Sequence, residues 1–499
     1  MTTGFSHLID LASERMGGIA LYANDEFFAP KEHLLLDSEP EYREEAYTDH
    51  GKWMDGWETR RRREPGNDFC LIRLGARGIV HGVVVDTTHF RGNYPESCKI
   101  EACSLPGTPS VETLLDPSTP WVELVPETEL RGHCHNEIPV HSDVVATHIK
   151  LTIIPDGGVA RLRVHGEAVA DWSRLDAFRG PIDLAAARNG GRAVAQSDMF
   201  FGPSQNLLMP GPARNMGEGW ETRRRRDDGH DWVVVQLGGA GVIQAVEVDT
   251  SHFKGNAPGS CRLEVAHITA PPADPSQWEE IEFEPILEAK LQPDTRQLFE
   301  DEVMLAGPAT HARIRIFPDG GFARLRIYGR TERAQELALK LMRFNVQPVD
   351  EAVEALRACC DSSQWAERVA AARPFADLTV FRKVADKVWW ELGESAWLEA
   401  FKAHPRIGDR TGSAWSRGEQ SGVADATDAT KDTLAAENKR YEEKFDFVFL
   451  ICATGKSAEE MLATLKARMN NDRAAEIRVA AEEQRKITHL RIDKLLLEI

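Results

Sequence analysis

The chain has 499 residues, of which 42% are hydrophobic and 28% charged, and its formal net charge is −19. One hydrophobic core rarely serves this length, so we expect about three folded units. The negative charge argues against a nucleic-acid partner. No uncharged apolar run is long enough for a membrane span. Eight cysteines without a CxxC pair and no signal-peptide pattern predict a cytoplasmic protein.

An internal repeat organises the first two thirds of the chain. Residues 57–63, Trp-Glu-Thr-Arg-Arg-Arg-Arg, recur unchanged at 220–226, and Pro-Asp-Gly-Gly-x-Ala-Arg-Leu-Arg occurs at 155–163 and 318–326. Near the start, Asp25 matches Asp198. A second motif, Asp-Thr-x-His-Phe-x-Gly-Asn, shows the same spacing of 163 residues and relates Asp86 to Asp249, His89 to His252 and Asn93 to Asn256. These repeated series indicate two copies of one domain.

Both copies have β character. Residues 82–86 and 242–248 form short segments rich in β-branched side chains. Residues 161–165 and 324–328 alternate polar with apolar side chains, which is typical of strands with one solvent-facing side. Pro-Asp-Gly-Gly favours a turn between strands. We expect two tandem jelly-roll β-sandwiches, over residues 1–178 and 179–332.

The pattern changes after Gly329. Residues 349–360 and 474–497 show helical spacing, and Ser457 followed by Glu460 is a capping signature. Residues 340–499 are therefore predicted to form an all-α domain, with a partly helical connector at 331–347.

The three repeated motifs resemble those of allantoicase, and the resemblance covers residues 1 to about 332. That family splits allantoate into urea and ureidoglycolate, so its site must hold one carboxylate and two ureido groups. Guanidinium forks suit a carboxylate, and Asn, Asp and Glu suit ureido groups. The resemblance implies substrate-binding roles for Glu58, Arg60, Asp86, His89, Asn93, Glu221, Arg223 and Asn256.

We assign the catalytic roles to Asp249 and His252, with the histidine protonating departing urea or activating water. Three alternatives remain open from the residues alone. Each histidine could instead bond the turn of its own loop, and each arginine run could be a solvated strand with surface ion pairs. The two copies could also share one cleft, or one of them could be structural.

The sequence His133-Cys134-His135 raises the question of a metal. Alternate residues on a strand share a face, so only His133 and His135 could converge, and two ligands fall short of a zinc site. A weakly held divalent ion among Asp, Glu and His side chains of the repeats stays open.

The helical part resembles the decarboxylase that converts 2-oxo-4-hydroxy-4-carboxy-5-ureidoimidazoline (OHCU) into S-allantoin. The matching segments are His-Pro-Arg-Ile-Gly at 404–408, Ser416 with Glu419 and Gln420, residues 447–455, and residues 482–491. The resemblance implies a reaction without a cofactor, in which the substrate's ring takes up the electrons left by carbon dioxide.

In that reading His404, ending a helix that begins near Glu394, is the general acid or base, since histidine titrates near neutral pH. Glu419 orients it or touches the ureido arm. The substrate is bound by Pro405, Ser416, Gln420, Ile451 and Arg491. His404 could alternatively be a helix cap.

Arg491 continues an inward stripe of the last helix, formed by Ile477, Ala480, Gln484 and Ile487. Its guanidinium needs a partner, which is the substrate carboxylate or a structural acid such as Glu419.

The sequence thus predicts a bifunctional enzyme of the ureide pathway with small-molecule substrates. The alternative for the β repeats is a non-catalytic module that binds a small ligand or carbohydrate, and for the helical domain a scaffold. By analogy with other jelly-roll enzymes we expect a homo-oligomer. The two reactions are not consecutive, because allantoin must first be opened to allantoate, so channelling is not implied.

Overall fold

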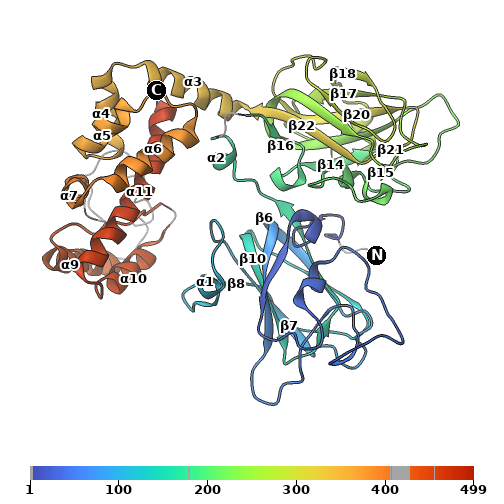
Figure 1. Cartoon of the computed structure of the whole chain (residues 1–499), viewed down its shortest axis with the longest axis horizontal. Coiled ribbons are helices and arrows are strands. Elements are labelled where there is room, and N and C mark those ends of the chain that lie inside the picture. The colour runs from blue at the N-terminus through green and yellow to red at the C-terminus, as the bar shows by residue number, and fades with distance from the viewer. Residues whose placement is uncertain are drawn as a thin grey trace. The chain divides into compact units, whose positions relative to one another are not determined.

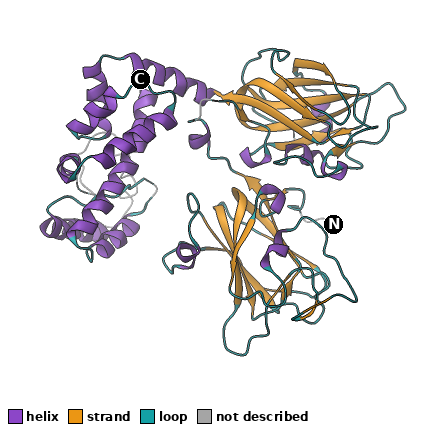
Figure 2. Ribbon diagram, viewed as in Figure 1, coloured by secondary structure: helices purple, strands orange, loops and turns teal. Residues whose placement is uncertain are grey.

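A computed structural model describes residues 4–177, 180–272, 274–404, 406, 428–454 and 456–498. The chain divides into two compact units, one of Met1–Leu175 with Gly180–Glu332 and one of Asp176–Arg179 with Arg333–Ile499. The first is built of strands and the second of helices (Figure 1 and Figure 2). The predicted fold class, two tandem β-sandwiches followed by an all-α domain, is confirmed. None of the described helices is long and apolar enough to cross a membrane.

Repeat 1 of the β unit is an eight-stranded assembly in the order β1-β12-β6-β10-β7-β8, with β2 and β9 also pairing with β6. Two-residue strands form the separate pairs β5-β11 and β3-β4. The strands are β1 (Ile9–Asp10), β2 (Ile19–Ala23), β3 (Tyr47–Thr48), β4 (Gly51–Lys52), β5 (Trp57–Glu58), β6 (Asp68–Asp86), β7 (Ser97–Cys103), β8 (Val122–Glu129), β9 (His135–Pro139), β10 (Val145–Ile154), β11 (Gly158–Val159) and β12 (Arg161–Ala168). Short helices α1 (Val111–Leu115) and α2 (Trp172–Leu175) accompany them.

Repeat 2 has the same strand order, β13-β22-β16-β20-β17-β18, with β14 and β19 pairing with β16 and a separate β15-β21 pair. Its strands are β13 (Ile182–Asp183), β14 (Arg192–Gln196), β15 (Trp220–Glu221), β16 (Asp231–Asp249), β17 (Ser260–Ala266), β18 (Glu284–Lys290), β19 (Arg296–Phe299), β20 (Ala309–Phe317), β21 (Gly321–Phe322) and β22 (Arg324–Thr331). The repeat inferred from the sequence is thus a structural repeat.

The long strand β6 explains how one chain segment serves both layers of a sandwich. Its first part, near Asp68, pairs with β2 and β10, and its last part, ending at Asp86, pairs with β9 and β12. Val83 and Val85 are fully buried in the core, so Val84 and Asp86 point to the opposite face of the sheet. The polar second motif therefore starts where a buried strand ends, and β16 repeats this arrangement.

Each repeat buries one histidine at an equivalent position. His148 in β10 is 1% exposed and His311 in β20 is 3% exposed. Nδ1 of each ring lies within hydrogen-bond distance of the preceding threonine hydroxyl, at 2.8 Å from Thr147 and 2.9 Å from Thr310. Within the described residues, Nε2 of neither ring has a hydrogen-bond partner. Burial, aided by nearby Arg73 for His148, lowers the pKa of both histidines to about 4.

These histidines predict an acid-labile β unit. The unfolded chain binds protons at these rings from about pH 6.5 downward, whereas the folded chain resists protonation until about pH 4. Stability is therefore full above pH 6.5 and falls toward pH 4, by about 3 kcal/mol for each ring. In urea denaturation with pulse proteolysis, His148→Gln should flatten the dependence of unfolding free energy on pH over this range. An unchanged slope in both His148→Gln and His311→Gln would show that other groups dominate.

The helical unit begins earlier than residue 340, because α3 continues directly from the last strand. Its helices are α3 (Glu332–Val346), α4 (Val349–Cys359), α5 (Ser363–Ala371), α6 (Leu378–Glu391), α7 (Glu394–Lys402), α9 (Asp428–Phe445), α10 (Ala458–Arg468) and α11 (Arg473–Glu498). The predicted capping box at Ser457 and Glu460 is present. Asp176 and Ala177 also belong to this unit, and the Thr379 hydroxyl donates to the Ala177 carbonyl at 3.3 Å.

Candidate functional site

The second motif, Asp-Thr-x-His-Phe-x-Gly-Asn, and the Pro-Asp-Gly-Gly-x-Ala-Arg-Leu-Arg sequence, which we call the third motif, meet at one edge of each sandwich. Gly157 has φ of 138°, which favours glycine, and a Cβ there would come within 2.9 Å of the Asn93 carbonyl oxygen. A Cβ on Gly158 would overlap the Phe90 ring at 2.0 Å. Gly320, with φ of 119°, approaches Asn256 in the same way. The glycines of the third motif therefore let the second-motif loop pack against the turn.

The Trp-Glu-Thr-Arg sequence, which we call the first motif, reaches the same edge. The carboxylate of its glutamate bonds to the carboxamide of the asparagine that ends the second motif. Asn93 Nδ2 donates to Glu58 Oε1 at 2.7 Å, and Asn256 Nδ2 donates to Glu221 Oε1 at the same distance. Burial raises the pKa of Glu58, although the bond from Asn93 opposes this. The structure thus brings together two pairs of the residues selected from the sequence, each pair bonded to itself. Direct contact of these four side chains with substrate stays a prediction.

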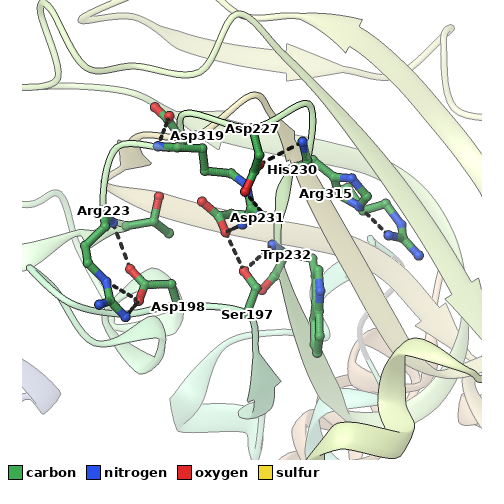
Figure 3. Close-up of polar contacts among 12 residues, drawn as sticks. Ser197, Asp198, Arg223, Asp227, His230, Asp231, Trp232, Arg315 and Asp319 are labelled. Carbon is green, nitrogen blue, oxygen red and sulfur yellow. Dashed lines mark hydrogen bonds and ion pairs between the residues drawn. The ribbon is translucent and has the colours of Figure 1, made fainter.

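The first arginine of each run lies at the surface. Arg60 Nε donates to Asp25 Oδ2 at 2.7 Å, and Arg223 Nη2 donates to Asp198 Oδ1 at 2.8 Å. Figure 3 shows the second of these pairs beside the buried carboxylate of Asp231. The side chains of Arg60 and Arg223 are 64% and 66% exposed, so they resemble the surface ion pairs considered above. Their predicted contact with substrate is untested.

His89 and His252 both adopt positive φ, of 70° and 73°. Their Nε2 atoms lie 3.1 Å from the Pro40 carbonyl oxygen and 2.9 Å from that of Ala213. Each ring therefore contacts another loop, 49 residues away for His89 and 39 for His252, and not its own turn. A histidine held in left-handed backbone is uncommon and marks a site that the surrounding structure enforces.

The carboxylates of the second motif are nearly buried. Asp86 and Asp249 are each 5% exposed, and each accepts a hydrogen bond from a backbone N–H two residues later. Asp86 Oδ2 also lies 3.6 Å from Nε2 of His135 on the neighbouring strand β9. Asp86 and His135 line a cleft of about 450 Å³. In repeat 2 the residue opposite Asp249 on the neighbouring strand is Arg296 and not a histidine.

Buried arginines of the third motif are members of this region that the sequence did not single out. Arg161 is 1% exposed, and its Nη2 donates to Asp55 Oδ2 at 2.7 Å. The equivalent Arg324 is 2% exposed, and burial lowers its pKa to about 10. Its Nη1 donates to the Glu218 carbonyl at 2.7 Å. No local signal marks their burial, because the alternation of polar and apolar residues over 161–165 and 324–328 predicts that these arginines lie on the solvent-facing side of a strand.

His133 and His135 do not converge on a metal in the described structure. Nδ1 of His133 accepts a hydrogen bond from the His89 N–H at 2.9 Å, whereas His135 lies beside Asp86. In the described part of the chain, no three His, Cys, Asp or Glu side chains are grouped as metal ligands. A divalent ion in the β unit stays a prediction.

In the helical unit, His404 lies two residues after α7, and its N–H donates to the Phe401 carbonyl at 3.1 Å. Ile451 is buried in a segment without regular secondary structure, and Arg491 on α11 is 8% exposed. The predicted inward stripe of α11 is confirmed, since its four other members are at most 5% exposed. Pro405, Ser416, Glu419 and Gln420 lie outside the described residues.

The fold and the doubled polar edge define a two-part protein, a repeated β-sandwich enzyme joined to a helical one. Residues 9–169 and 182–332 match the allantoicase repeat, and residues 345–493 match OHCU decarboxylase. The chain belongs to the allantoicase family and carries an OHCU decarboxylase domain after the repeats. It is a bifunctional enzyme of the ureide pathway.

Two relatives matched over the β unit agree with the allantoicase assignment. "Probable allantoicase 2" of Burkholderia pseudomallei is 48% identical over 326 residues, which are 64% of this chain and 94% of that protein. The allantoicase structure from Saccharomyces cerevisiae has a TM-score of 0.53 and 32% identity, covering 64% of this chain and 92% of that one. A solved OHCU decarboxylase with (S)-allantoin is 37% identical over 28% of this chain and 95% of that one, with a TM-score of 0.26.

Proposed function

We propose that the β unit hydrolyses allantoate to ureidoglycolate and urea, and that the helical unit decarboxylates OHCU to S-allantoin. The observation that supports the first reaction is the meeting of three doubled motifs at one polar edge in a chain of the allantoicase family. A module that only binds carbohydrate is not favoured, because the relatives matched over the same residues are named probable allantoicases. Homo-oligomerisation and a cytoplasmic location stay predictions.

In the helical unit, the substrate-side groups are proposed to be His404, Ile451 and Arg491. A histidine just past a helix C-terminus is favoured as a cation by the helix dipole, which suits proton donation. The buried guanidinium of Arg491 would bind a carboxylate. Glu419 is proposed to orient His404, and Pro405, Ser416 and Gln420 to complete the pocket. This set gives proton transfer and orientation without a cofactor.

The two activities should be separable. Residues 1–332 should release urea from allantoate, and residues 333–499 should yield S-allantoin from OHCU, because each of the two units is internally compact. The measurements are a urea assay and circular dichroism of the allantoin formed. A β fragment that is folded but inactive would contradict independence.

The same urea assay tests the metal. Preincubation of the full chain with a chelator, followed by addition of a divalent ion, should abolish and restore urea release if the β unit uses one. Decarboxylation by the helical unit should not respond to the chelator.

A further inference from the structure

The cleft beside Asp86 lies on the face of the repeat 1 sheet that points away from the core. Strands β6, β9 and β12 line its floor, and the segments around Arg15 and Asp37 line its wall. Gln205 and Met209 of repeat 2 complete the wall. Its volume of about 450 Å³ suits a small molecule. Its ionisable lining consists of five acidic side chains, two guanidiniums and two histidines.

Two guanidiniums of this cleft retain hydrogen-bonding capacity. Arg163 Nη1 lies 3.7 Å from Asp10 Oδ2, and Arg15 Nε lies 3.3 Å from Asp37 Oδ2. Among the residues that the structure describes, Arg163 Nη1, Arg15 Nη2 and Asp10 Oδ2 are buried atoms without a hydrogen-bond partner. Such atoms are costly unless a ligand or water satisfies them.

On the same face of repeat 2, the guanidiniums at the equivalent positions are hydrogen-bonded within the repeat. Arg296 replaces His135 and donates to both oxygens of Glu247, at 2.7 and 2.8 Å. Arg326, the equivalent of Arg163, donates to the Leu207 carbonyl at 3.2 Å and to the Met209 carbonyl at 2.6 Å. In repeat 2, these bonds therefore occupy the groups equivalent to those that line the cleft in repeat 1.

The wall of the cleft also differs between the copies. By the register that relates Asp25 to Asp198, Arg15 and Asp37 correspond to Arg188, which is exposed, and Pro210. Trp57 follows Asp25 by 32 residues, but the equivalent separation in repeat 2 is 22. The extra residues of repeat 1 include the hairpin β3-β4 and directly follow the cleft wall.

We propose that the allantoate reaction takes place in the repeat 1 cleft, with Arg15 and Arg163 binding the carboxylate and His135 transferring the proton. This inference rests on the proposed hydrolysis and says which copy performs it. Acidic side chains outnumber guanidiniums in the lining, which suits a ligand with one carboxylate and two ureido groups rich in N–H donors. The sequence alone selected Asp249 and His252 of repeat 2, and the contacts of the two faces favour repeat 1.

The oxygen of water bonds to the central carbon of allantoate, and the bond from that carbon to one ureido nitrogen breaks. The electron pair stays on that nitrogen, which takes up the proton released by water and leaves as urea. His135, 58% exposed at the cleft, carries that proton from water to nitrogen, and Asp86 positions the ring through Nε2.

Matched variants of the full chain test this assignment. His135→Gln should lower kcat for urea release by about 10²–10⁴-fold. Arg15→Gln should mainly raise KM for allantoate. Asp86→Asn should cost more activity than Asp249→Asn, and it should shift the pH profile of kcat because it acts through His135. The control Arg296→Gln, at the repeat 2 position equivalent to His135, should stay within about twofold of the unsubstituted protein.

The outcomes distinguish a failure of the proposed hydrolysis from a failure of its assignment to repeat 1. If the unsubstituted protein releases no urea, the proposed hydrolysis fails and the cleft assignment fails with it. If it does release urea, near-normal kcat in His135→Gln, or a larger loss in Asp249→Asn than in Asp86→Asn, overturns only the assignment to repeat 1. Since His135 is exposed, thermal unfolding of His135→Gln should match the unsubstituted protein, which excludes misfolding as the cause.

Discussion

Replacing His404 by Asn or Gln should lower the rate of OHCU decarboxylation by about 10²–10⁴-fold, the range for loss of a general acid or base. Loss of carbon dioxide leaves a carbanion-like centre that must be protonated on one face to give the S product. Decarboxylation also proceeds slowly in solution, so allantoin should still form, but as a racemate. The measurement is the rate of OHCU loss together with circular dichroism of the allantoin produced.

His489 provides the matched control within the same unit. Its Nε2 lies 2.7 Å from Asp386 Oδ1 on the partly exposed surface between α11 and α6, so it is already paired within the protein. His489→Gln should keep both rate and handedness. If His404→Asn instead yields only S-allantoin at near-normal rate, then His404 is a helix cap, and Glu419 or a bound water supplies the proton.

The sequence predicted the architecture well because its signals are local and doubled. An exact recurrence such as residues 57–63 and 220–226 identifies a repeated fold without any knowledge of contacts. Period-2 alternation in residues 161–165 placed a strand there, and β12 covers it. The helical stripe that includes Ile477 and Ala480 likewise predicted the buried face of α11.

The candidate site was harder to predict because it depends on pairing between distant strands. His135 was weighed in the sequence only as a metal ligand beside His133. Its position next to Asp86 follows from the antiparallel register of β9 with β6, which places these two residues opposite each other. Such a register is set by the whole sandwich and not by local sequence.

The difference between the two copies could not be predicted from the sequence for the same reason. The motifs Asp-Thr-x-His-Phe and Pro-Asp-Gly-Gly are identical in both repeats, so they cannot distinguish them. The distinguishing residues, His135 against Arg296 and Val84 against Glu247, lie outside these motifs. Only strand pairing shows that Arg296 and Glu247 form an ion pair on the face that carries the cleft in repeat 1.

Asp55→Ala should lower the free energy of unfolding of the β unit by about 3–5 kcal/mol, because it leaves the guanidinium of Arg161 buried without its carboxylate. Arg161 also donates from Nη1 to Asp55 Oδ1 at 3.3 Å, so the pair is bidentate. Burial alone would raise the pKa of Asp55, but bonds from Arg161 and from the Glu41 N–H outweigh it and lower the pKa. The carboxylate is therefore stabilised as an anion in the folded state.

The measurement is urea denaturation of the full chain with pulse proteolysis, in which fragments report the β unit separately. The control is Arg43→Ala, which removes an ion pair with Glu41 in the same loop whose two side chains are each 60% exposed. Exposed pairs contribute at most about 1 kcal/mol, so this variant should unfold close to the unsubstituted protein. Equal small losses in both variants would show that water reaches Arg161 once Asp55 is removed, and that the pair serves to position the third motif more than to stabilise it.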